Sequence, residues 1–272
     1  MSYRIIALDL DGTLLTPTKT ILPESLEALA KARQAGVKVL LVTGRHHVAI
    51  HPFYQALALD TPAICCNGTY LYDYHAKTVL RSDPLPKEQA HQALDMLNAA
   101  GLLGLLYVDN AMVYQTASGH IERTINWGLR QPESQRPTFL QADNLHDAAD
   151  AAQSVWKLAV AHENIPELQQ FSQQVADKLG LACEWSWYNQ VDIAKAGNSK
   201  GKRLAEWVKS EGYQMSDVLA FGDNFNDLSM LENVGLGVAM GNAEEGVKSR
   251  AKRVIGTNLE PGIAETIYQE VL

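Results

Sequence analysis

Asp9 and Asp11, near the N-terminus, are the residues whose types and spacing are best suited to chemistry. They follow the apolar run 5–8, which has the length and composition of a buried strand, and they precede Gly12. In an extended chain, side chains two residues apart lie on the same side, so both carboxylates would face one point. Two carboxylates that close repel each other, and a bound cation or a shared proton relieves the repulsion. The segment therefore predicts a metal-assisted site, although Asp-Gly is also a common hairpin turn.

Polar clusters follow two further apolar runs in the same way. Thr43 and Gly44 come directly after the run 37–42, and the cluster 222–227 comes after the run 218–221. In open parallel sheets, ligands bind beyond the carboxyl ends of the strands. We therefore expect the three clusters to meet at one edge of a sheet.

The residue types in these clusters suit a phosphate group held beside a cation. Three carboxylates offer the hard oxygen ligands that Mg²⁺ prefers, namely Asp9, Asp11 and Asp223. Thr43 supplies a hydroxyl and Gly44 an unencumbered N–H for an anion, and Lys200 adds a positive charge. Each has a simpler use, such as a helix cap for Thr43 or a solvated side chain for Lys200. Their joint occurrence at three strand ends favours a site.

Strand and helix patterns alternate in both terminal parts of the chain. Helical spacing is expected over residues 23–35, 47–57, 199–211 and 225–233, with helices also near 243–250 and 260–271. The intervening runs are almost continuously apolar, which is typical of parallel strands covered on both faces. We therefore predict an α/β domain with a Rossmann-like parallel sheet, formed by residues 1–83 and 189–272.

The middle of the chain, residues 84–188, has a different pattern. Four strand-like stretches, at 102–108, 113–116, 156–162 and 181–188, alternate with longer helical patterns. We predict an α+β domain inserted into the α/β domain. Trp185 and Trp187 would share one face of a strand, and we expect both to pack in the core rather than to stack on a ligand.

Composition limits the classes of partner. The chain has 272 residues, a net charge of −8 and three cysteines. The acidic balance argues against nucleic acid or a membrane surface as a partner. The cysteine count provides no disulfide framework, the N-terminus does not resemble a signal peptide, and no apolar run approaches the length of a membrane span. We therefore expect a protein of the cytoplasm, with no obligate protein partner evident.

Four short motifs make the pattern specific: DLDGT at 9–13, VTGR at 42–45, NSKG at 198–201 and GDNFND at 222–227. In this order, and with an inserted middle domain, they resemble the haloacid dehalogenase (HAD) superfamily, and within it the Cof-type phosphatases with a type IIB cap. The likeness extends over essentially the whole chain. It implies that residues 84–188 form the cap and the terminal parts the catalytic core.

The resemblance implies a role for each motif residue. Asp9 would be the nucleophile, and Asp11 the general acid and then the base. Mg²⁺ would be held by Asp9, Asp223 and Asp11, the last through its carboxylate or its backbone carbonyl. The groups expected to hold the phosphate are the Leu10 N–H, Thr43, Gly44, Lys200 and Asn226. Asp227 would orient Lys200 or a metal-bound water.

The implied function is Mg²⁺-dependent hydrolysis of small phosphomonoesters through an aspartyl-phosphate, with pyridoxal 5′-phosphate and sugar phosphates as expected substrates. The Mg²⁺ ion and Lys200 would offset the repulsion between a carboxylate and a phosphate dianion. A phosphomutase of the same superfamily is one alternative. A phospho-aspartate signalling domain is another, although such a domain needs only about 120 residues and has no use for an acid such as Asp11.

Overall fold

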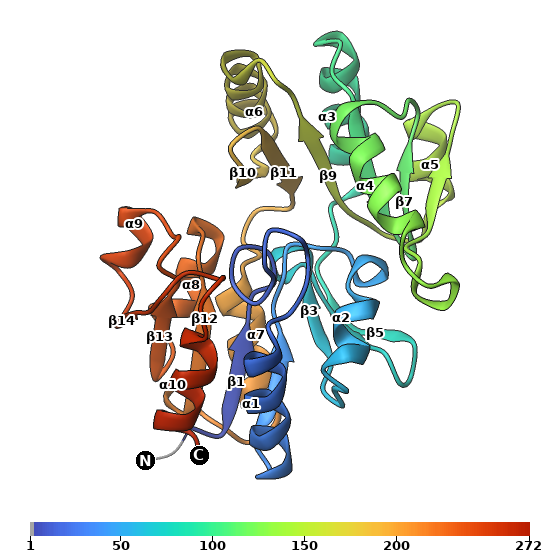
Figure 1. Ribbon diagram of the computed structural model, residues 1–272. Helices are drawn as coiled ribbons and strands as arrows, with labels where there is room; N and C mark the ends of the chain where they lie inside the picture. The colour runs from blue at the N-terminus through green and yellow to red at the C-terminus, as the bar shows by residue number, and fades with distance from the viewer. Residues whose placement is uncertain (1–2) are drawn as a thin grey trace. The chain divides into compact units, whose positions relative to one another are not determined.

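The computed structural model describes residues 3–272, which form two compact units (Figure 1). Unit 1 comprises the residues up to Gly44 together with Phe53–Arg81 and Ser199–Leu272. Unit 2 comprises Arg45–Pro52 and Ser82–Asn198. Each unit has its own sheet and its own core.

The sheet of unit 1 is parallel throughout and has five strands. In spatial order they are β14 (Arg253–Val254), β13 (Leu236–Ala239), β12 (Val218–Gly222), β1 (Ile5–Leu8) and β2 (Lys38–Leu41). The central strand β1 lies between β12 and β2, in register from Ile5 to Leu8 with both neighbours. The three strands that the sequence marks by polar clusters are therefore adjacent, as expected.

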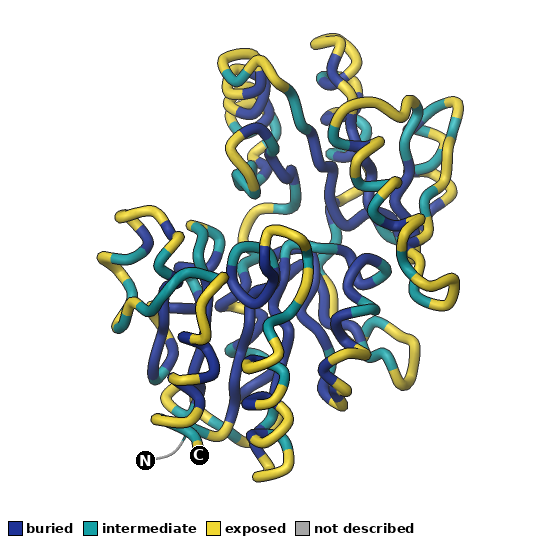
Figure 2. Tube along the Cα trace, viewed as in Figure 1, coloured by how far each residue is buried: buried dark blue, intermediate teal, exposed yellow. Residues whose placement is uncertain are grey.

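Helices cover both faces of this sheet, which confirms the predicted α/β class. The helices in the terminal parts of the chain are α1 (Pro23–Gln34), α2 (His51–Ala56), α7 (Lys200–Ser210), α8 (Leu228–Leu231), α9 (Glu245–Lys248) and α10 (Gly262–Glu270). Figure 1 shows α1 and α10 in front of the sheet and α7 behind it. On the α7 face, alternate strand residues such as Ile5 and Ala7 pack against Leu204 and Trp207. Strands β1, β12 and β13 are buried throughout, as the dark blue tube in Figure 2 shows, whereas the edge strand β14 is partly exposed.

Two expected helices are interrupted. The helix expected over 47–57 is a 3₁₀ turn, His47–Ala49, followed by α2. Ile50 leaves helical backbone angles between the two, and Pro52 lacks the N–H that a continuous helix would bond to residue 48. The helix expected over 225–233 likewise begins as a 3₁₀ turn, Phe225–Asp227, before α8.

A small second sheet completes unit 1. It has the order β3 (Ala63–Cys65), β4 (Tyr70–Asp73), β5 (Thr78–Ser82). The 3₁₀ turn Cys66–Gly68 connects β3 to β4. The backbone N–H of Thr43, just after β2, donates to the carbonyl of Ile64 in β3, which fixes this turn beside the end of β2.

Unit 2 contains a six-stranded sheet in which all neighbours are antiparallel except β7 and β8. Its spatial order is β10 (Ala182–Trp187), β11 (Gln190–Ala194), β9 (Val155–Ala161), β6 (Gly104–Val108), β7 (Ala111–Tyr114) and β8 (Phe139–Gln141). Its helices are α3 (Lys87–Ala99), α4 (Gly119–Leu129), α5 (Leu145–Ala151) and α6 (Ile165–Leu179), with a 3₁₀ turn at Glu133–Gln135. The inserted α+β domain is thus observed.

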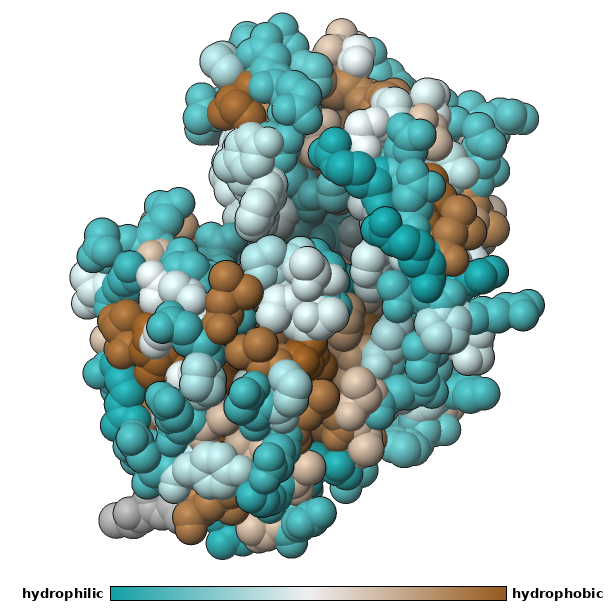
Figure 3. All heavy atoms as spheres, in the orientation of Figure 1, coloured by the Kyte–Doolittle hydropathy of each residue, from teal (hydrophilic) through white to brown (hydrophobic). Residues whose placement is uncertain are grey.

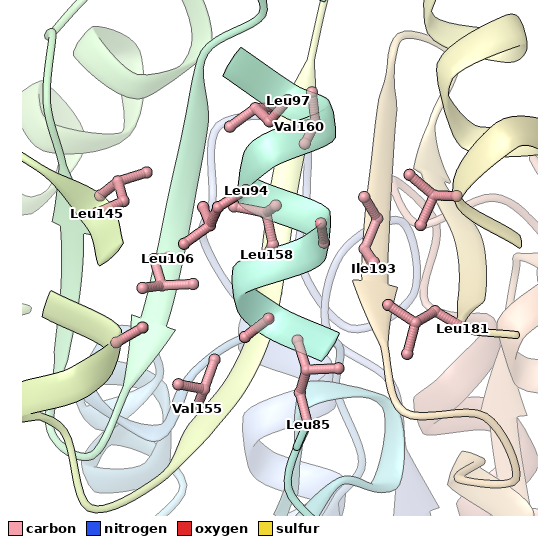
Figure 4. Close-up of a cluster of buried hydrophobic side chains, with 14 of the residues drawn as sticks. Leu85, Leu94, Leu97, Leu106, Leu145, Val155, Leu158, Val160, Leu181 and Ile193 are labelled. Atoms are coloured by element: carbon pink, nitrogen blue, oxygen red, sulfur yellow. The ribbon is translucent and has the colours of Figure 1, made fainter. Parts of the chain in front are cut away.

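The core of unit 2 lies between one face of this sheet and the helices α3, α5 and α6. Figure 4 shows Leu94 and Leu97 of α3 beside Leu158 and Val160 of β9. The apolar side chains of α3 recur at helical spacing and those of β9 at strand spacing, so each element presents one apolar face.

The structure differs from the sequence-based expectation in three details of unit 2. The segment Arg45–Pro52, expected in the core domain, belongs to this unit. Strand β11 was expected in the core domain, but it pairs with β9 and β10, so this unit extends to Asn198. Trp185 packs against the core as expected, whereas Trp187 is 62% exposed. A register shift between Trp185 and Trp187 breaks the alternation that would have placed both indoles on one face.

Hydrophobic atoms on the face shown in Figure 3 form separate patches among polar ones. Among the described residues, no helix is both long enough and apolar enough to span a membrane.

Candidate active site

A buried lysine joins two of the predicted site carboxylates in unit 1. Lys200, at the start of α7, donates from Nζ to Asp9 Oδ1 at 2.7 Å and to Asp227 Oδ1 at 2.6 Å. The Lys200 side chain is 1% exposed, and Asp9 and Asp227 are 5% and 0% exposed. Buried charges need partners, so this arrangement fixes the three side chains relative to one another.

Asp227 also holds the loop that follows β12. Its Oδ2 accepts hydrogen bonds from the backbone N–H groups of Asp223 at 2.9 Å and Asn224 at 3.0 Å. One carboxylate therefore orients both Lys200 and the loop that carries Asp223. The positioning role of Asp227 in the reaction stays a prediction.

Asp223 is held on its other side by the loop after β1. The Thr13 hydroxyl donates to Asp223 Oδ1 at 2.7 Å. Gly12 has φ +80°, and a Cβ at this position would lie 2.2 Å from Asp223 Oδ2. Because no larger residue fits there without a shift, Gly12 allows the two loops to approach this closely.

Burial and mutual repulsion dominate the electrostatics of these carboxylates. Burial and the charge of Asp227 raise the pKa of Asp9 to about 7, against the opposing effect of Lys200. Burial and the charge of Asp9 also hold the pKa of Asp223 well above its ordinary range. Burial alone would lower the pKa of Lys200, but Asp227 and Asp9 raise it above its ordinary value. The site thus keeps Lys200 charged while Asp9 and Asp223 resist ionisation.

The donor set fits a divalent cation with a preference for oxygen. Oxygens of Asp9, Asp223 and Asp227 lie within 4.8 Å of one another. With all groups ionised, these carboxylates and Lys200 leave a net charge of −2, which one Mg²⁺ neutralises. Carboxylate oxygens without sulfur or imidazole ligands suit Mg²⁺ rather than a soft metal.

Asp11 lies at the edge of the site and outside this group of three. Its Oδ1 accepts a hydrogen bond from Lys19 Nζ at 2.5 Å, and its side chain is 37% exposed. The structure thus separates the two aspartates by environment, with Asp9 buried against Lys200 and Asp11 accessible. Such a difference suits a nucleophile and a proton-transfer group.

The predicted phosphate-binding residues occupy the loops around Asp9. Leu10 and Thr43 are buried, at 0% and 1% exposure, and each lies two residues beyond the end of a strand, β1 and β2 respectively. Gly44 and Asn226 both contact Asn67: Asn226 Nδ2 donates to Asn67 Oδ1 at 3.1 Å, and a Cβ on Gly44 would lie 2.9 Å from the same oxygen. All the site residues predicted from the sequence belong to unit 1.

Three residues with contacts to this site received no role from the sequence: Thr13, Lys19 and Asn67. Thr13 belongs to the DLDGT motif, so the sequence alone could have indicated a role for its hydroxyl. Asn67 and Gly68 form a dipeptide that is typical of turns, and this pattern predicts no contact with the site. Lys19 lies eight positions from Asp11, and no sequence pattern indicates that the intervening loop returns it to the carboxylate.

The chain belongs to the family of haloacid dehalogenase-like hydrolases, whose pattern it matches over residues 6–267. This confirms the resemblance noted from the four motifs. The chain is 61% identical over 272 residues, all of both chains, to the pyridoxal phosphate phosphatase YbhA of Escherichia coli.

Solved structures share the fold. A haloacid dehalogenase-like hydrolase from Bacteroides thetaiotaomicron superimposes with a TM-score of 0.87 at 25% identity, covering 98% of this chain and 99% of the other. The subclass IIB sugar phosphatase BT4131 gives a TM-score of 0.82 at 22% identity, with 98% of each chain covered. The expected arrangement of a HAD core with a type IIB cap is confirmed.

Proposed function

We propose that this hydrolase is a Mg²⁺-dependent phosphatase that transfers the phosphoryl group of a small phosphomonoester to Asp9 and then to water. The observation that carries the proposal is the group formed by the buried side chains of Asp9, Lys200 and Asp227 together with the half-buried Asp223. With all four groups ionised, their net charge of −2 would be costly in this site, and a bound cation would offset it. A cation and Lys200 together would allow the Asp9 carboxylate to approach a phosphate dianion.

In the first step, an Asp9 oxygen attacks phosphorus while the bond to the substrate's alcohol oxygen breaks. Lys200, hydrogen-bonded to Asp9 Oδ1, would stabilise negative charge on the transferring group. Asp9 and Asp223 would hold Mg²⁺, which would supply the remaining charge compensation. The product of this step is an aspartyl-phosphate and the free alcohol.

Asp11 would provide the proton that the leaving oxygen needs. Being accessible, it can donate a proton to that oxygen and then accept one from the water that attacks the aspartyl-phosphate. The second step returns Asp9 and releases inorganic phosphate. Asp227 stays paired with Lys200 throughout and acts by positioning it.

The substrates proposed are pyridoxal 5′-phosphate and, less selectively, sugar phosphates. The pyridoxal assignment rests on the 61% identity with the E. coli phosphatase over its whole length. Groups in unit 1 can bind the phosphate of any monoester, so we assign selection of the leaving group to the cap, unit 2. We place the reaction in the cytoplasm, where the free thiols Cys65, Cys66 and Cys183 would stay reduced.

Phosphate release from a panel of phosphorylated metabolites, with and without Mg²⁺, tests the proposal. We expect turnover only with Mg²⁺, and kcat/KM for pyridoxal 5′-phosphate at or above that for hexose phosphates. If pyridoxal 5′-phosphate falls a hundredfold below the best sugar phosphate, the named substrate is wrong but the phosphatase assignment stands. Turnover that persists after exhaustive removal of metal would contradict the mechanism. A product in which phosphate has moved to another position, dependent on a bisphosphate activator, would identify a mutase instead.

A further inference from the structure

The turn between β3 and β4 has an unusual backbone. Cys66, Asn67 and Gly68 are consecutive residues with left-handed φ values of 49°, 55° and 89°. Residues other than glycine seldom adopt this conformation, and asparagine tolerates it better than most. Such strain persists only where the surroundings enforce it, and it concentrates at functional sites.

This turn contacts the loops of three of the four motifs. The Asn67 N–H donates to the carbonyl of Thr43 at 3.0 Å. A Cβ on Gly68 would lie 2.1 Å from the carbonyl oxygen of Ser199, directly before Lys200. Arg203 of α7 donates from Nε to the Gly68 carbonyl at 2.9 Å, which holds the turn against the start of that helix.

The Asn67 side chain, which is 6% exposed, contacts the third loop, the one that carries Asn226. Its Oδ1 accepts one N–H of the Asn226 carboxamide at 3.1 Å. Asn226 Oδ1 is buried and has no hydrogen-bond partner among the described residues. The contact with Asn67 is therefore what distinguishes the two ends of the Asn226 amide.

We propose that Asn67 is a positioning residue that fixes the orientation of the Asn226 amide, so that Asn226 presents its remaining N–H, and not its oxygen, to the substrate phosphate. This inference rests on the proposed phosphatase function. A phosphate oxygen accepts hydrogen bonds and is repelled by a carbonyl oxygen, so the orientation decides whether Asn226 attracts or repels it. Without the Asn67 oxygen, rotation of the amide by 180° exchanges a donor for an acceptor.

Asn67→Gly removes the side chain and leaves the backbone conformation of the turn possible, because glycine adopts the left-handed conformation without strain. Ala58→Gly is the matched control: Ala58 is also left-handed, at φ 49°, but is exposed and lies outside the site. For Asn67→Gly we expect KM, and Ki for inorganic phosphate, to rise about tenfold, since a hydrogen bond to a charged group is lost. We expect kcat to change less than about threefold, because Asn226 holds the phosphate in both the ground and transition states. Ala58→Gly should leave both constants unchanged.

A double-mutant cycle with Asn226→Ala distinguishes positioning from a general structural effect. If Asn67 acts through Asn226, the double variant has the KM of Asn226→Ala alone, within about twofold. Multiplied effects of the two substitutions, or a wild-type KM in Asn67→Gly, would overturn the inference. A lower kcat at unchanged KM would also overturn it, since that result indicates a smaller folded fraction. Absence of turnover in the wild-type protein would instead defeat the phosphatase assignment.

If Asn67→Gly does not fold, the wild-type protein provides the test. The Asn226 side-chain amide resonance, assigned by its loss in Asn226→Ala, should shift when inorganic phosphate is added in the presence of Mg²⁺. A resonance that does not respond to saturating phosphate would overturn the inference.

Discussion

Without metal, the protein should lose stability as the pH rises from about 4 to 7, and Asp9→Asn should remove much of this loss. Burial and the charge of Asp227 outweigh the opposing effect of Lys200 and raise the pKa of Asp9 to about 7 from an ordinary 3.8. Between these values the folded protein binds a proton at Asp9 that the unfolded chain does not bind. The free energy of unfolding therefore falls as the pH rises through this window.

The size of the effect follows from the same difference. Raising the pKa from 3.8 to about 7 corresponds to at most about 4 kcal/mol, because each pKa unit is worth about 1.36 kcal/mol. The raised pKa of Asp223 acts in the same direction, and Asp9→Asn removes a charge that contributes to it. In EDTA at pH 8 we expect Asp9→Asn to exceed the wild type by about 2–4 kcal/mol. At pH 4, where the wild-type Asp9 is protonated, the two should differ by less than about 1 kcal/mol.

Urea denaturation at both pH values, in EDTA and in saturating Mg²⁺, measures these differences. Mg²⁺ should close the gap at pH 8, because it binds the wild-type carboxylates in the folded state. Asp60→Asn, which changes an exposed carboxyl of unit 1, is the control and should show no pH-dependent gain. If Asp9→Asn is no more stable than the wild type at pH 8 in EDTA, the account of a buried, uncompensated charge is refuted.

Three further outcomes are expected. Chelation should abolish turnover and Ca²⁺ should restore little of it, because its looser coordination disturbs the in-line geometry; comparable rates with Ca²⁺ and Mg²⁺ would argue against this. Thr13→Val removes the hydrogen bond to Asp223 Oδ1 and should raise the Mg²⁺ concentration for half-maximal rate about tenfold or more. Thr18→Val, at an exposed position, is the control. In unit 2, Lys157→Met leaves Asp192 buried without its 2.7 Å partner and should lower the free energy of unfolding, measured with urea, by about 3–5 kcal/mol. The double variant Lys157→Met, Asp192→Leu should regain much of this stability. A double variant as unstable as Lys157→Met would contradict this expectation.

The residues that the structure brings together were predictable because most of them belong to short motifs that follow strands. Asp9, Thr43 and Asp223 each follow an apolar run, and the rule that ligands bind beyond the ends of parallel strands brings them together without knowledge of side-chain contacts. The observed order of β12, β1 and β2 agrees with that rule.

The features that were missed depend on contacts between distant segments. The bond from Asn226 to Asn67 joins residues 159 positions apart, and no periodicity encodes it. The predicted boundary at residue 189 placed the residues of β11 in the core domain, because the pairing of this strand with β9 and β10 is set by the sheet and not by its own sequence. The exposure of Trp187 follows from a register shift that simple alternation cannot predict.

The central claim, that Asp9 carries the phosphoryl group and Asp11 moves the protons, is tested most directly in Asp11→Asn. With p-nitrophenyl phosphate the leaving group needs no acid, so Asp9 should still be phosphorylated, while the attacking water lacks its base. We predict a rapid burst of one nitrophenol per enzyme followed by slow turnover, and borohydride reduction after an acid quench should convert residue 9 to homoserine, as detected by peptide mass spectrometry. Steady turnover without a burst, or modification at any residue other than Asp9, would contradict the account.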